Sequence, residues 1–103
     1  MMNIAEMMKQ AKELQEKMGT VQADLASKTV VGSAGAGMVS AQMNGKGELL
    51  DVTIDKTIVK PEEVEMLQDL IVAAVRDAAR KAGELGRSEM TKLTGGLKVP
   101  GLF

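Results

Sequence analysis

Apolar residues near the start of the chain recur at alternating steps of three and four positions. This spacing places their side chains along one side of a helix, as in a coiled-coil seam. Asn3, followed three residues later by Glu6, is typical of a helix cap, so we expect the helix to begin close to the first residue. The seam consists of Ile4, Met7, Ala11, Leu14, Met18, Val21 and Leu25.

The middle of the chain alternates apolar and polar residues, which predicts β-strands at residues 28–33, 38–43 and 49–55. The sequence NGKG at residues 44–47 separates the last two strands, and Asn-Gly is a strong hairpin signal. We expect one face of this sheet to be buried and the other to face water. The buried face would comprise Val39, Ala41 and Met43 on the second strand and Leu50, Val52 and Ile54 on the third.

The glycine-rich sequence VGSAGAGMV at residues 31–39 has two interpretations, a phosphate-binding loop or a turn. A phosphate-binding loop runs from a strand into the N-terminus of a helix, ideally with Lys-Ser or Lys-Thr following. Here the next residues, MVSAQM, alternate as a strand, and no such lysine pair follows. The pattern therefore favours a turn between the first two strands.

Pro61 and the two glutamates after it predict the start of a second helix, because proline suits the first helical position and acids suit the first turn. Apolar residues then recur at helical spacing and carry the helix to about Lys92, with weak points at Gly83 and Gly86. The apolar side of this helix contains Val64, Leu67, Ile71, Ala74, Ala78, Ala82 and Leu85.

The first helix is too long for the sheet beside it. About 24 helical residues span roughly 36 Å, whereas strands of six or seven residues span about 22 Å. The overhanging seam and the sheet edges would both be exposed in a single chain. We therefore expect an α+β fold, α-β-β-β-α, in which two long helices flank a three-stranded antiparallel sheet, assembled as a homodimer.

Composition limits the chemistry open to the chain. Its 103 residues are expected to form a single domain, residues 1–103, with about residues 94–103 as a loose tail. Cysteine and histidine are absent, which excludes disulfides, thiolate metal sites and the commonest general base. The longest apolar run, residues 70–75, is far shorter than a membrane helix of roughly 20 residues. We expect a cytoplasmic protein without membrane contact, enzymatic activity, cofactor, metal or small-molecule substrate.

The net charge of −1 conceals an uneven distribution. Residues 61–75 carry four acids and no base, whereas residues 76–103 carry six bases and three acids. Complementing the macrodipole of the second helix would explain this layout without any ligand.

A cluster of arginines on the second helix suggests an alternative role for this charge. Arg76, Arg80 and Arg87 share one outward stripe, where an anion would relieve their mutual repulsion, although Glu84 can pair with Arg80. The chain has a single aromatic residue, so it lacks the stacking platforms that bind single-stranded nucleic acid. The backbone of duplex DNA is the candidate anion.

Seven short segments, spread over nearly the whole chain, are individually weak signals but together form a specific pattern. They are MKQA at 8–11, QEKM at 15–18, GAGMV at 35–39, NGKGEL at 44–49, VTID at 52–55, EMLQDLIVAAV at 65–75 and DAARK at 77–81. In this order and spacing they resemble the YbaB/EbfC family of nucleoid-associated proteins.

The resemblance implies a small bacterial protein of the nucleoid, a tweezer-like homodimer whose helices project from a shared sheet. Such a protein binds duplex DNA with little sequence preference, alters its conformation and affects gene regulation, with no enzymatic activity or cofactor. The family's DNA contacts are attributed to the projecting helices rather than to a motif. The candidate DNA-binding residues are therefore Lys9, Lys12 and Lys17 on the first helix and Arg76, Arg80, Lys81 and Arg87 on the second.

A second hypothesis is a dimeric adaptor that binds protein helices through a methionine-rich coiled-coil surface, without nucleic acid. Met7, Met8 and Met18 lie on the first helix, and flexible thioethers suit adaptable surfaces. The simpler interpretation is that Met7 and Met18 fill the seam.

Overall fold

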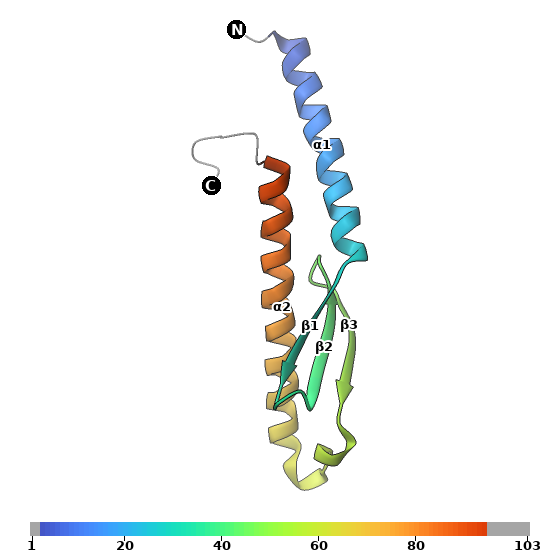
Figure 1. Ribbon diagram of the computed structural model, residues 1–103, viewed down its shortest axis with the longest axis vertical. Helices are drawn as coiled ribbons and strands as arrows, with labels where there is room; N and C mark the ends of the chain where they lie inside the picture. The colour runs from blue at the N-terminus through green and yellow to red at the C-terminus, as the bar shows by residue number, and fades with distance from the viewer. Residues whose placement is uncertain (1–2, 95–103) are drawn as a thin grey trace.

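The computed structural model describes residues 3–94 and has the predicted α-β-β-β-α layout. Figure 1 shows α2 running along the sheet and α1 continuing away from one end of it. The loose tail expected at residues 94–103 lies, apart from Thr94, outside the described residues. The elements are α1 (Ile4–Ser27), β1 (Thr29–Ala34), β2 (Val39–Asn44), β3 (Leu49–Ile54), two 3₁₀ turns (Lys56–Ile58 and Pro61–Glu63) and α2 (Val64–Thr94).

Helix α1 begins with the predicted cap. Asn3 Oδ1 accepts a hydrogen bond from the Glu6 N–H at 2.8 Å, which satisfies one of the donors that the first helical turn leaves free. The second helical region also begins as predicted, because Pro61 opens a 3₁₀ turn that leads directly into α2.

The last turn of α1 is attached to the turn between β2 and β3. The Gly45 N–H donates to the carbonyl oxygens of Leu25 at 2.8 Å and Lys28 at 3.0 Å. A Cβ on Gly45 would lie 2.8 Å from the Leu25 oxygen, so only glycine allows this approach. Beyond this attachment α1 extends past the end of the sheet.

The sheet is antiparallel with strand order β1-β2-β3, and each strand begins within one residue of its predicted position. The glycine-rich connection between β1 and β2 is a turn, as the pattern favoured. Gly35, Ala36 and Gly37 have φ of 61°, 55° and 87°, and the Met38 N–H donates to the Gly35 carbonyl at 3.1 Å. A strand follows these residues, so the loop does not lead into the N-terminus of a helix.

The predicted hairpin between β2 and β3 is also present, and Asn44 organises it. Asn44 Oδ1 accepts hydrogen bonds from the N–H groups of Lys46 and Glu48, both at 3.0 Å. Gly47, rather than the Asn-Gly pair itself, supplies the positive φ, at 85°.

The register between β2 and β3 shifts between Gln42 and Met43, and this shift leaves Leu50 without a partner on β2. Leu50 is therefore half exposed, and its predicted place on the buried face was wrong. A bulge adds one residue to a strand and interrupts the alternation of its side chains, a feature that the residue pattern does not reveal. Val52 and Ile54, on the far side of the shift, pack against the core as predicted.

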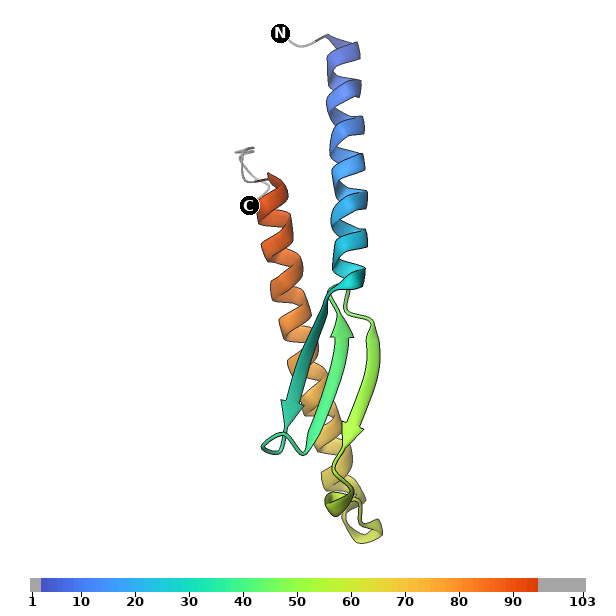
Figure 2. The same ribbon diagram turned by 45° about the vertical axis from the view of Figure 1, so that its right-hand side comes forward.

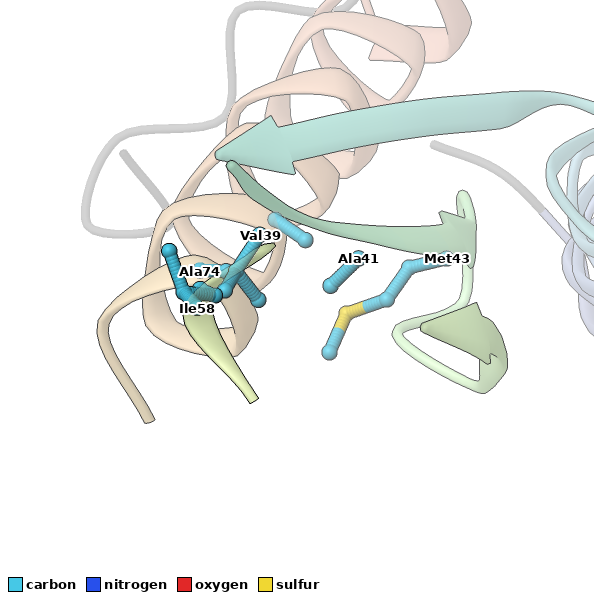
Figure 3. Close-up of a cluster of buried hydrophobic side chains, with 6 residues drawn as sticks. Val39, Ala41, Met43, Ile58 and Ala74 are labelled. Atoms are coloured by element: carbon cyan, nitrogen blue, oxygen red, sulfur yellow. The ribbon is translucent and has the colours of Figure 1, made fainter. Parts of the chain in front are cut away.

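The core lies between one face of the sheet and α2. Alanines supply the helix side of this contact, so the helix axis lies close to the strands. Figure 3 shows the cluster from the sheet and the 3₁₀ turn gathered beside the helix. Its buried members are Val39, Ala41, Met43, Ile58, Ala74 and Ala78.

Gly32 of β1 lies where the sheet and α2 are closest. A Cβ at Gly32 would overlap the backbone nitrogen of Ala78 and the carbonyl oxygen of Ala74, and would lie 2.7 Å from the Ala78 Cα. Val64, which was predicted on the packed side of α2, is half exposed because the helix begins beyond the end of the sheet (Figure 1).

The overhang of α1 is confirmed. Figure 2 shows α1 extending past both the sheet and the end of α2. Leu25 is the one buried residue of α1, whereas Ile4, Met7 and Leu14 are 76%, 54% and 43% exposed. The seam is therefore uncovered along the first turns of the helix.

Candidate nucleic-acid interface

The seven predicted DNA-binding residues all lie on the two long helices. Lys9 precedes Met18 by nine residues, about two and a half helical turns, so it lies opposite the apolar seam of α1. Lys12 lies on this polar side as well, whereas Lys17 borders the seam, four residues before Val21; both are exposed. Lys9 and Lys12 would remain outward-facing if the seam were covered.

The Arg80 side chain is paired with acidic residues of its own helix. Its guanidinium forms ion pairs with Asp77 at 2.9 Å and Glu84 at 2.8 Å, and these two contacts raise the pKa of Arg80. Exposed ion pairs contribute at most about 1 kcal/mol each. Turning Arg80 toward a phosphate would nevertheless leave two carboxylates beside the DNA, so we expect it to contribute little to binding.

Lys81 and Asp77 cover the free edge of β1. Lys81 Nζ donates to the Val31 carbonyl at 2.8 Å, and the Asp77 carboxylate accepts from the Ser33 N–H at 3.0 Å. Uncovered strand edges invite pairing with other chains. The spacing of Asp77 and Lys81 indicates an ion pair within the helix, but their hydrogen bonds to β1 arise only from the tertiary fold.

Replacing Asp77 with asparagine is expected to destabilise the fold at neutral pH but not in strong acid. The Ser33 N–H and the Arg80 guanidinium hold the pKa of Asp77 at about 2, below its ordinary value of 3.8. Ionised Asp77 therefore stabilises the fold above about pH 4, and this contribution is lost as the pH falls toward 2. Urea unfolding of both proteins at pH 7, 4 and 2.5 measures the effect. A stability difference that stays constant across this range would contradict it.

The remaining candidates have no such partners. Within residues 3–94, no hydrogen bond or ion pair is formed by the side chains of Lys9, Lys12, Lys17, Arg76 and Arg87. All five are exposed. The part of α2 from residue 76 to 94 contains five bases and three acids, so its net charge is +2.

An apolar groove of about 450 Å³ lies between α1 and α2. Arg87 lies at its rim, because the guanidinium Nη1 would be 3.5 Å from a Cβ placed on Gly83. A positive side chain thus borders the space between the two helices. The groove is lined by Met18, Val21, Gln22, Leu25, Gly83, Gly86, Arg87, Met90 and Thr91.

Metal-binding clusters and membrane-spanning helices are both absent from the described part of the chain. No group of three or more His, Cys, Asp or Glu residues among residues 3–94 is placed to hold a metal ion. None of the described helices has the length and apolar character needed to cross a membrane.

The arrangement of helices and strands defines a known fold. It matches the crystal structure of the uncharacterized protein HP0035 from Helicobacter pylori with a TM-score of 0.83, covering 92% of this chain and 100% of that one. The two sequences are 22% identical, so this likeness shows the fold alone.

Sequence comparisons identify the family. The model of the YbaB/EbfC DNA-binding family matches residues 1–97. A nucleoid-associated protein of Syntrophobacter fumaroxidans is 55% identical over 95 residues, covering 92% of this chain and 86% of the relative. Nucleoid-associated protein DP1429 of Desulfotalea psychrophila is 48% identical over 101 residues, covering 98% and 95%. The chain belongs to the YbaB/EbfC DNA-binding family, which confirms the resemblance found in the sequence.

Proposed function

We propose that this protein is a nucleoid-associated protein that binds duplex DNA as a homodimer, with little sequence preference. The observation that carries the proposal is the pair of exposed, unpartnered arginines on α2, Arg76 and Arg87, within a segment of net positive charge. Phosphate contacts of this kind supply affinity but carry no sequence information. Such binding would distribute the protein along the nucleoid.

The exposed seam of α1 supports the homodimer. Isolated soluble domains rarely leave a long apolar stripe in water, and a second copy of α1 would cover it through coiled-coil packing. The sheet offers a second surface, because β3 pairs with β2 alone and carries the half-exposed side chains of Leu49 and Leu50. The edge of β1, by contrast, is covered by Asp77 and Lys81.

A homodimer would present every cationic surface twice at a fixed separation. Duplex DNA that contacted both copies would have to follow their geometry, and this is how the protein would alter DNA conformation and affect gene expression. The lysines of α1 would add contacts, but residues 4–27 contain three lysines and four acids, so their net effect is expected to be smaller.

The DNA-binding surface can be tested by replacing individual arginines with alanine. Anisotropy titrations of a 20-base-pair duplex over a salt series should show a log–log slope that falls by about 1 for each phosphate contact removed. We expect this decrease for Arg76→Ala and Arg87→Ala. Arg80→Ala is the matched control, because Arg80 is also exposed on the same helix but is already paired.

Two other outcomes have distinct meanings. Unchanged slopes for both Arg76→Ala and Arg87→Ala would contradict the assignment of the site to α2 and move it to the lysines of α1. Binding that depends on phosphate contacts is strongest at low salt, about 50 mM. If the unaltered protein failed to bind DNA under this condition, the proposal of DNA binding would be wrong. The adaptor hypothesis would then be favoured.

A further inference from the structure

Glu89 of α2 is the one charged residue that is buried among residues 3–94, with 8% of its surface exposed. Its carboxylate accepts a hydrogen bond from Lys28 Nζ at 2.7 Å, and Lys92 Nζ lies 3.6 Å away. Lys28 Nζ also lies 3.0 Å from the Asp24 carboxylate. The pair Lys28–Glu89 therefore connects the C-terminal end of α1 to α2.

The position of this pair is unusual in the fold. Lys28 is the single residue between the end of α1 at Ser27 and the start of β1 at Thr29, so it forms the junction from which α1 projects. On α2, Glu89 lies seven residues beyond Ala82, the last buried alanine of that helix. The pair thus holds the two helices together outside the main core.

The remaining contacts of α1 are concentrated near the same end. Residues 3–17 are all exposed, and the groove contacts with α2 begin only at Met18. The orientation of the projecting part of α1 consequently depends on a few contacts around Leu25 and Lys28. A small change in angle there would move the far end of the helix by a large distance.

The burial of this ion pair is one-sided, because the Glu89 side chain is 10% exposed and the Lys28 side chain 40%. Desolvation of Glu89 offsets part of the attraction, so the pair adds little net stability. Removing Lys28 is costly, however, because the Glu89 carboxylate remains buried. The pair therefore favours one arrangement of the two helices over alternatives.

We propose that Glu89 is a positioning residue that acts through Lys28 to fix the direction of α1 relative to α2, and so the separation of the cationic surfaces on the two helices. The role in DNA binding rests on the proposed function. The role in fixing the helices does not.

The helix direction can be measured by electron spin resonance distances. The chain contains no cysteine, so Gln10→Cys and Ser88→Cys introduce two unique labelling sites on exposed positions of α1 and α2. Gln10 lies 18 residues before Lys28, about 27 Å along the helix, so a tilt of about 10° would move it by about 5 Å. Dilution with unlabelled protein restricts the measurement to labels on one chain.

We expect Glu89→Ala to shift or broaden the distance distribution by about 5 Å, given the length of about 27 Å between Gln10 and Lys28. Lys28→Met should reproduce the effect from the other side of the pair, and it serves as the second variant if Glu89→Ala fails to fold. Glu89→Gln should remain close to the unaltered protein, because glutamine can still accept the hydrogen bond from Lys28. Glu84→Ala is the matched control, since it removes the same charge from the same helix, and the Glu84 carboxylate pairs with Arg80 of α2.

DNA binding provides an independent readout. Loss of a carboxylate by itself favours phosphate binding, so Glu84→Ala should bind the duplex as tightly as the unaltered protein or more tightly. Glu89→Ala should bind several-fold more weakly despite the same change in charge. Equal distance distributions in Glu89→Ala and the unaltered protein would overturn the positioning role. Absence of DNA binding by the unaltered protein would overturn the proposed function while leaving the distance test intact.

Discussion

Replacing Gly32 with alanine is expected to lower the free energy of unfolding by about 3 kcal/mol, at the upper end of the range for overpacked cores. The added methyl group would overlap backbone atoms of Ala74 and Ala78. Backbone atoms in a helix cannot move aside individually, so α2 as a whole would have to withdraw from the sheet. That movement would open the contact between Val39 and the alanines, which is completely buried in the unaltered protein.

Urea unfolding followed by far-UV circular dichroism measures this loss. The matched control is Gly19→Ala on α1, where a Cβ would meet nothing within 4 Å. Alanine is the better helix former by about 1 kcal/mol, so this variant should be as stable as the unaltered protein or more stable. Equal stability of the Gly32→Ala variant and the unaltered protein would show that α2 does not lie as close to β1 as described.

Gly32 illustrates the limit of prediction from residue patterns. The alternation correctly indicated a strand at this position, and helical spacing correctly indicated the row of alanines on α2. A glycine within a strand can mark a close backbone approach, but the pattern does not say which element approaches. Only the packed fold places Gly32 against Ala74 and Ala78. Leu50 was misplaced for a related reason, since the register shift depends on the pairing of two strands.

The candidate site was likewise only partly predictable from the sequence. The sequence identified the cationic residues and the pairing of Arg80 with Glu84, because residues four apart on a helix are neighbours. It could not show that Lys81 bonds to β1, since Lys81 and Val31 are 50 positions apart in the sequence. The sequence also could not distinguish Glu89 from an ordinary surface acid, because its contact with Lys28 arises only in the packed fold.

The largest effect on assembly is expected from a charge placed in the α1 seam. Leu14→Glu should weaken the proposed homodimer by about 100-fold, because an unpaired carboxylate in a coiled-coil interface costs about 3 kcal/mol. Leu14 is 43% exposed in the single chain, and it makes no contribution to the buried core. The substitution should therefore change the association constant while leaving the fold of each chain intact.

Sedimentation equilibrium between 1 and 100 μM, the range typical of weak self-association, would measure this change. Thr20→Glu is the matched control, because Thr20 is exposed and lies two residues from Met18, on a different side of α1 from the seam. A Leu14→Glu variant that still dimerised as tightly as Thr20→Glu would exclude the seam as the interface and leave the open edge of β3 as the surface for the second copy. Monomers in the unaltered protein would contradict the homodimer itself, since neither the seam nor the β3 edge would then be covered by a second copy.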